Sequence, residues 1–269
     1  MDVNKHRPIA IFDSGTGGLT VAKEIHRILP YERMVYFGDT ARVPYGTKSK
    51  ETIVRYARQI TIFLMRFNPK IVVIACHSVS SIAFNTLCRN FPHIKFADVI
   101  TPSVICALKT TRNHRIGVIG TTATISSRRY EFLLKRADSR VKIYASACPL
   151  FVPLAEEGWL TGQIPLEVAR RYLSPLVKHN IDTLVLGCTH YGLLKRTIKK
   201  VVGESVALID AAEVTSRWVK DILENDRGSD NGAPETPVLY FSDLAQNHWK
   251  VLKAFWGSDD LRVYKGVIE

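Results

Sequence analysis

The chain has 269 residues, of which 46% are hydrophobic and 23% charged, as in a soluble globular protein with one large or two small α/β domains. No apolar run reaches the roughly 18 residues of a membrane span, and no signal-peptide core precedes Phe12, so we expect a cytoplasmic protein without a membrane partner. The net charge of +12 is scattered along the chain, so we expect a solvated basic surface and no nucleic-acid partner.

Short runs of β-branched residues alternate with helical patterns along most of the chain. In the helical segments apolar side chains recur every three or four positions, as at Ile53, Ala57 and Ile60. Strands that are apolar on both faces and separated by helices predict mainly parallel sheets covered by helices. The polar segment 224–237 is typical of a mobile loop before a last strand and a last helix. In chain order, the other predicted strands are residues 9–12, 34–37, 71–75, 115–120, 141–146, 183–187 and 206–209.

A weak internal repeat links the two halves of the chain. The segment "IAIFDSGTGG" from Ile9 is echoed by "IGVIGTTATI" from Ile116, 107 residues later. The segments "IVVIACHS" and "TLVLGCTH" place two cysteines 112 residues apart. We therefore predict two similar α/β domains with mainly parallel sheets, related by a pseudo-two-fold axis, with the active site in the cleft between them. The expected domains are residues 1–98 plus 209–269, and residues 99–208.

Five cysteines without a CxxC pair argue against a disulfide framework and against a structural zinc site. Two of them, Cys76 and Cys188, follow predicted strands at equivalent places in the two halves. Ligands bind at such strand ends in open parallel sheets, and the first amides of a following helix would favour a thiolate there. We interpret the other three, Cys88, Cys106 and Cys148, as packing residues.

Two thiols on facing halves would approach one substrate from opposite sides. That arrangement suits inversion at a carbon, because one thiolate can remove the α-proton while the other thiol delivers a proton to the opposite face. His77 is next to Cys76, but neighbours in an extended segment point to opposite faces, which argues against a direct pair. His190 lies two positions beyond Cys188, on the same side of the chain if the backbone is still extended there, and is the better candidate for an acid–base partner.

Strand-end motifs in this order and spacing closely resemble bacterial glutamate racemase, a member of the cofactor-independent aspartate/glutamate racemase superfamily. The resemblance extends over nearly the whole chain. The motifs are "IAIFDSGTGGLTV", "YFGDTARVPYGTKS", "VIACHS", "PLFVPLAEEGW" and "LVLGCTHYGLL".

The resemblance implies interconversion of L- and D-glutamate without PLP or metal, which supplies D-glutamate for peptidoglycan, in an enzyme that is often a homodimer. It implies that Cys76 is the base towards D-glutamate and Cys188 the base towards L-glutamate, with Asp13 and His190 assisting the two thiols. Hydroxyls and backbone amides suit carboxylate recognition, and acidic groups suit the ammonium. The implied substrate-binding residues are Asp13, Ser14, Tyr45, Gly46, His77, Ser78, Thr121, Thr124, Glu156, Thr189 and His190.

The chain departs from the family pattern beside both thiols. Where the family usually has Asn-Thr after the first cysteine, this chain has His77 and Ser78, and Gly192 stands in place of a proline. The imidazole of His77 is bulkier than an amide and can take up a proton near pH 6.5. A racemase of aspartate or of broader amino-acid specificity is therefore the alternative substrate class. A single-cysteine hydrolase, a non-catalytic binding protein and a Cys/His metal site are the alternative functions.

Overall fold

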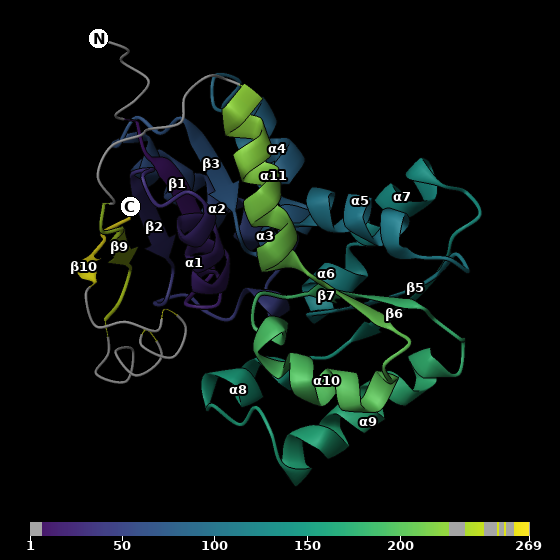
Figure 1. The fold of residues 1–269 in the computed structure, drawn as a ribbon. Coiled ribbons are helices and arrows are strands. Elements are labelled where there is room, and N and C mark those ends of the chain that lie inside the picture. Colours follow the sequence, from purple (N-terminus) through teal and green to yellow (C-terminus); the bar gives the residue numbers. More distant parts are fainter. Residues whose placement is uncertain (1–6, 226–234, 245–251, 253–255, 257–260, 269) are drawn as a thin grey trace.

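The computed structural model describes residues 7–225, 235–244, 252, 256 and 261–268. Their strands form two separate sheets, each with helices packed on it, and Figure 1 shows the two sheets as neighbouring halves of the molecule. Within both sheets every strand pair is parallel, so the predicted fold class of two mainly parallel α/β units is confirmed.

The first sheet has six strands in the order β10-β9-β2-β1-β3-β4. Its central strands are apolar and fully buried, as expected for parallel strands covered on both faces. The predicted last strand is present as β9, whereas the short β4 and the edge strand β10 were not predicted. The strands are β1 (Ile9–Asp13), β2 (Met34–Gly38), β3 (Ile71–Ile74), β4 (Phe96–Asp98), β9 (Val238–Phe241) and β10 (Arg262–Lys265).

The second sheet has four strands in the order β6-β5-β7-β8. All four were predicted to within about one residue at each end. Because β8 runs to Asp210, the domain boundary expected at residue 208 falls inside this strand, and the domain limits stay a prediction. The strands are β5 (Arg115–Gly120), β6 (Lys142–Ala147), β7 (Thr183–Gly187) and β8 (Ala207–Asp210).

The two sheets repeat one another in strand order and in register. The order β2-β1-β3-β4 in the first matches β6-β5-β7-β8 in the second. Ile9 of β1 pairs with Ile71 of β3, and the residues 107 and 112 positions later, Ile116 and Thr183, pair in the same way. The internal repeat in the sequence therefore corresponds to a repeated arrangement of strands, with β3 equivalent to β7.

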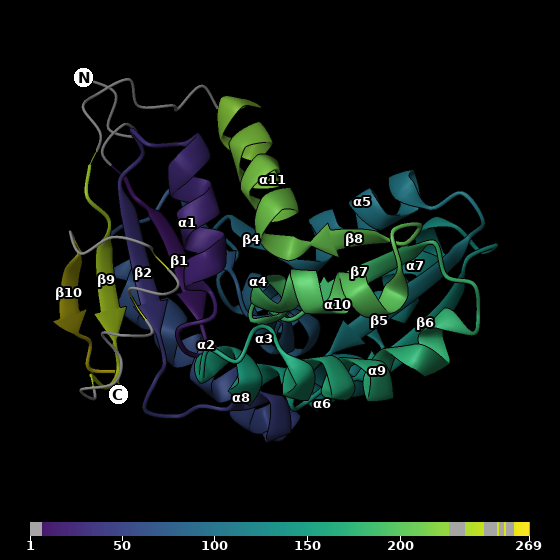
Figure 2. The same ribbon diagram turned by 60° about the horizontal axis from the view of Figure 1, so that its bottom comes forward.

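Helices cover both sheets and connect them. Helix α11 follows β8 and crosses to lie against α1 and α5, so it leads the chain from the second sheet back towards the first (Figure 2). In α2 the predicted apolar face is buried, with Ile53, Ala57 and Ile60 all fully inaccessible to solvent. The helices are α1 (Leu19–Ile28), α2 (Lys50–Met65), α3 (His77–Ile82), α4 (Phe84–Asn90), α5 (Ile100–Thr110), α6 (Thr122–Ser126), α7 (Arg129–Ala137), α8 (Phe151–Glu156), α9 (Gln163–Val177), α10 (Lys195–Val202) and α11 (Ala211–Asn225).

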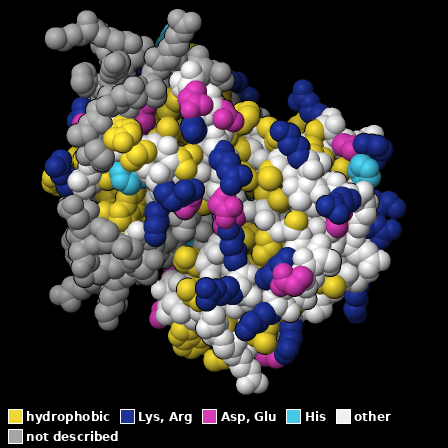
Figure 3. All heavy atoms as spheres, in the orientation of Figure 1, with side chains coloured by type: hydrophobic (Ala, Val, Ile, Leu, Met, Phe, Trp, Pro, Cys, Tyr) yellow, Lys and Arg dark blue, Asp and Glu magenta, His cyan; other side chains and the backbone are white. Residues whose placement is uncertain are grey.

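Most of the predicted polar loop at 224–237 and the place expected for the last helix lie outside the described residues. Among the helices that are described, none is both long and apolar enough to cross a membrane. On the face shown in Figure 3, lysines and arginines are dispersed and interspersed with acidic side chains.

Candidate active site

One small cavity of about 50 Å³, room for a few water molecules, lies at the carboxyl ends of strands from both sheets. Both predicted thiols line it, Cys76 after β3 and Cys188 after β7. Two predicted residues, Asp13 and Thr124, lie outside the lining. The predicted residues that do line the cavity are Ser14, Tyr45, Gly46, Cys76, His77, Ser78, Thr121, Glu156, Cys188, Thr189 and His190.

Cys76 ends the extended segment and caps the short helix α3. Its Sγ donates to Ser14 Oγ at 3.4 Å. Burial, with the nearby Asp13 carboxyl, raises the pKa of this thiol to about 12, although the Ser14 hydroxyl and the Val79 amide act in the opposite direction. The helix amide therefore favours the thiolate as expected, but desolvation outweighs this contribution and leaves the pKa of the thiol raised.

Asp13, the last residue of β1, is buried and close enough to Cys76 for its charge to affect the thiol. Its Oδ2 accepts from the Gly15 amide at 3.0 Å, while Oδ1 has no hydrogen-bond partner in the described part of the chain. Burial raises the pKa of this carboxyl, opposed by the charge of His190 and by backbone amides that include Gly18. The backbone at Gly18 passes so close that a Cβ there would lie 2.4 Å from Asp13 Cβ, which explains a glycine at this position.

Cys188 lies beside an acid–base pair. His190 Nδ1 is 3.8 Å from Cys188 Sγ, and His190 Nε2 is 3.2 Å from Glu156 Oε1 of α8. Burial disfavours the charged imidazole, but the hydrogen bonds to Cys188 and Glu156 outweigh it and raise the pKa of His190 to about 10. The two side chains converge because the chain turns here, with His190 in the helical region, and not because the segment stays extended as the sequence argument assumed. The predicted helix after Cys188 begins as the 3-10 turn Tyr191–Leu194, ahead of α10.

His77 is the first residue of α3 and only 2% exposed. Neither ring nitrogen has a hydrogen-bond partner in the described part of the chain, and the ring stacks 6.3 Å from that of Tyr130. Desolvation lowers the pKa of His77 to about 3, so the imidazole stays neutral at physiological pH. It forms no hydrogen bond with Cys76, in keeping with the predicted absence of a direct pair.

Hydroxyl groups connect the two halves across the cavity. Ser78 Oγ of α3 lies 3.0 Å from Thr121 Oγ1, which caps α6 and lies 3.0 Å from Thr124 Oγ1. Thr20 Oγ1 of α1 is 3.4 Å from the Thr189 carbonyl on the other side. Thr124 thus belongs to the hydroxyl chain although it does not line the cavity.

Several residues near the cavity were not singled out from the sequence. Val43 and Pro44 line it just before the predicted Tyr45, and Val152 lines it from α8. Each lies inside a motif that carried the family resemblance, but an apolar side chain gives no chemical signal of its own. A Cβ on Gly17 would lie 2.4 Å from Thr189 Oγ1, so this glycine permits the close approach of the two halves.

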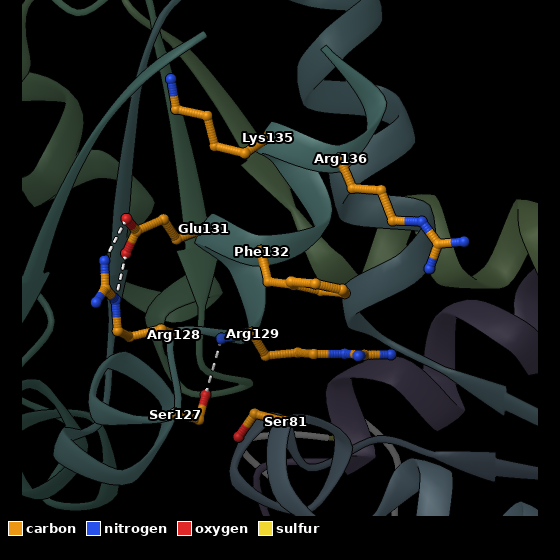
Figure 4. Close-up of a pocket in the computed structure, with 8 residues that line it drawn as sticks. All are labelled: Ser81, Ser127, Arg128, Arg129, Glu131, Phe132, Lys135 and Arg136. Carbon is orange, nitrogen blue, oxygen red and sulfur yellow. Dashed lines mark hydrogen bonds and ion pairs between the residues drawn. The ribbon is translucent and has the colours of Figure 1, made fainter. Parts of the chain in front are cut away.

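A larger groove of about 790 Å³ lies outside this site, between α3 and α7 (Figure 4). In this groove Arg128 forms an ion pair with Glu131 at 2.6 Å. The side chains of Arg129, Phe132 and Arg136 point in the same direction, away from that pair. Its lining includes neither a thiol nor an imidazole, so it offers no group for proton transfer near neutral pH.

The described residues also include no group of three or more His, Cys, Asp or Glu side chains arranged to hold a metal ion. The cavity with two thiols is therefore the candidate active site.

Comparisons with known proteins show the family of the chain. Residues 16–217 match the family model of Asp/Glu/Hydantoin racemase. Glutamate racemase of Geobacter metallireducens is 51% identical over 98% of this chain and 97% of its own length, and that of Aquifex aeolicus is 48% identical over 93% and 94%. The crystal structure of glutamate racemase from Francisella tularensis in complex with D-glutamate superposes with a TM-score of 0.91, at 37% identity and 98% coverage of both chains. The chain therefore belongs to the glutamate racemases of the Asp/Glu/hydantoin racemase family.

Proposed function

We propose that the chain interconverts L- and D-glutamate by a two-thiol proton transfer at Cα, without a cofactor. One observation carries the proposal: Cys76 and Cys188 follow equivalent strands of two repeated sheets and line the same cavity. A hydrolase with a single cysteine nucleophile has no use for the second thiol, and a binding protein has no use for either.

From L-glutamate, the Cys188 thiolate takes the α-proton, so the Cα–H bond breaks and an S–H bond forms. The Cys76 thiol then gives its proton to the opposite face of Cα, and D-glutamate results. The reverse reaction uses Cys76 as the base and Cys188 as the acid. The high pKa of Cys76 suits its role as the proton donor in the first direction.

The partners of the thiols differ in a way that fits these roles. His190, bridging Cys188 and Glu156, is a protonated imidazole that stabilises a neighbouring thiolate. Asp13, a buried carboxyl with a raised pKa, is a partner for Cys76 that can hold a proton. We assign these two side chains to assist the two transfers.

The hydroxyls and amides around the cavity suit the carboxylates of the substrate. Ser14, Ser78, Thr121 and Thr189 offer neutral donors, and Glu156 provides an acidic group for the ammonium. The bound D-glutamate in the Francisella tularensis relative supports glutamate as the substrate here. His77 is the feature that favours a second candidate, a racemase of aspartate or of broader amino-acid specificity, because its ring replaces a smaller amide at the cavity wall.

The test is exchange of the α-proton in D2O with pure protein, followed by proton NMR on L-glutamate and, separately, L-aspartate. We expect deuterium at Cα of glutamate together with formation of the D-enantiomer. Exchange with aspartate alone would establish the second candidate. No exchange with either amino acid would refute racemisation of both.

We further propose that the enzyme works in the cytoplasm as a homodimer and supplies D-glutamate for peptidoglycan, as the family resemblance implies. Sedimentation velocity tests the assembly: a single species at twice the 30.3 kDa chain mass is expected, and a monomer at micromolar concentration would contradict it.

A further inference from the structure

A buried carboxylate lies one residue beyond the end of β2. Asp39 is completely inaccessible to solvent, and its amide donates to the Asp13 carbonyl at 3.2 Å, so the residue is fixed beside the end of β1. It is not among the residues that line the thiol cavity. A charge buried this deeply needs several donors, and the structure provides them from three side chains.

The three donors come from two segments, the turn that follows β2 and the residue that follows β9. The Tyr45 hydroxyl donates to Asp39 Oδ2 in a short hydrogen bond, and Arg42 Nε donates to the same oxygen at 2.6 Å. Ser242, just after β9, donates to Asp39 Oδ1 at 2.8 Å. Arg42 is itself held, because its guanidinium lies 3.9 Å over the ring of Tyr56.

The hydrogen bond from Tyr45 matters because this residue belongs to the cavity wall. The segment Val43–Gly46 lines the cavity, and Tyr45 is 1% exposed. Its hydroxyl is turned to Asp39 and stays a donor, since burial and the Asp39 charge raise its pKa. Tyr45 therefore contributes its ring and backbone to the cavity, while its hydroxyl anchors the wall from behind.

The anchored wall faces the second half of the molecule closely. A Cβ on Gly46 would lie 3.0 Å from Thr121 Cβ, and Thr121 is the residue that meets Ser78 across the cavity. A small displacement of the backbone at Tyr45 and Gly46 would change the space in which a substrate carboxylate lies. The Tyr45 hydroxyl links this wall to the buried Asp39 carboxylate.

We propose that Asp39 is a positioning residue of the active site, which sets the cavity wall at Tyr45–Gly46 through the Tyr45 hydroxyl. The inference rests on the proposed function for its effect on turnover, but the placement of the wall can be measured without substrate. Asp39 does not touch the substrate and takes no part in the proton transfers.

The variants are Tyr45→Phe, which removes only the hydroxyl, Asp39→Asn, which removes the charge, and the two combined. Ser242→Ala is the matched control, because it loses a hydrogen bond to the same carboxylate from the side away from the cavity.

We expect KM for glutamate to rise about tenfold in Tyr45→Phe and in Asp39→Asn, the size expected for loss of a hydrogen bond to a charged group, with kcat changed less. The double variant should match the larger single effect, because both changes remove the same interaction. Ser242→Ala should stay within about twofold of the wild type.

Backbone amide exchange of the peptide that covers residues 43–48, without substrate, provides the independent readout. Exchange should be faster in Tyr45→Phe and Asp39→Asn than in Ser242→Ala at equal thermal stability. Unchanged exchange and unchanged KM in Tyr45→Phe would overturn the proposal, as would effects of the two single changes that multiply in the double variant. If the wild type fails to turn over glutamate, the proposed function fails, while the exchange experiment still decides the role of Asp39.

Discussion

Replacing His77 by Asn should make the protein less sensitive to acid. The imidazole is 2% exposed, and burial lowers its pKa from 6.5 to about 3. In the unfolded chain the ring takes up a proton as the pH falls through 6.5, whereas in the folded chain it stays neutral until about pH 3. Since the unfolded state then binds more protons, the free energy of unfolding must decrease as the pH falls through this window.

The size of the effect follows from the two pKa values. Between pH 7 and pH 5, this single histidine should remove about 2 kcal/mol from the free energy of unfolding, because each pH unit below 6.5 contributes about 1.4 kcal/mol. Asparagine does not titrate, so the His77→Asn variant should lose about 2 kcal/mol less than the wild type over the same interval. That is a large share of the stability of a typical domain.

Urea unfolding of both proteins at pH 7 and pH 5 measures the difference. The change in unfolding free energy with pH is compared between the proteins, so an effect of the substitution that is the same at both pH values cancels. His93→Asn, at an exposed position, is the control and should retain the acid sensitivity of the wild type. Equal pH dependence in the wild type and in His77→Asn would refute the reasoning, because it would mean that the ring is protonated in the folded state.

Three further predictions concern the candidate site. Cys76→Ala and Cys188→Ala should each lower racemisation of glutamate at least about a thousandfold, measured by circular dichroism of the amino acid; normal racemisation by either would rule out the two-thiol assignment. Glu156→Gln should lower the pKa of His190, because it removes a carboxylate whose hydrogen bond and charge raise it; an unchanged pKa in a proton NMR titration would contradict this. Gly17→Ala should lower both thermal stability and activity, since the added Cβ would lie 2.5 Å from the His190 ring, and a variant with wild-type melting temperature and rate would show that the halves need not approach so closely.

The sequence was sufficient to predict most of the fold, because parallel strands buried on both faces form distinct apolar runs. Strand β4 was not predicted because its three residues, Phe96–Asp98, are too few to show a periodic pattern and end on a carboxylate. Strand β10 was not predicted because Arg262–Lys265 lies at the edge of the sheet. Charged residues are common there, and only one neighbouring strand contributes to burial.

The residues that form the site could be predicted from the sequence more readily than the pKa values of their side chains. Adjacent polar residues at strand ends located both thiols and most of their neighbours, since the carboxyl ends of parallel strands meet at one edge. The net pKa of Cys76 depends on burial, which the sequence does not show, and on Asp13, which is 63 positions away. The bond from Tyr45 to Asp39 likewise depends on how a turn folds back on the strand before it.

The burial of both sulfurs also affects what happens between turnovers. On the two-thiol proposal, each conversion of L- to D-glutamate moves a proton onto Cys188 and takes one from Cys76, so the enzyme releases its product in the opposite proton arrangement. Cys76 is 5% exposed and Cys188 7%, so little of either residue is open to exchange with bulk water. If the free enzyme restores the protons of the two thiols slowly, its proton arrangement still reflects the last enantiomer that it converted. With one enantiomer in large excess, this proton exchange would become the slow step. The burial that shields the two thiols from water would then limit the rate of the whole cycle.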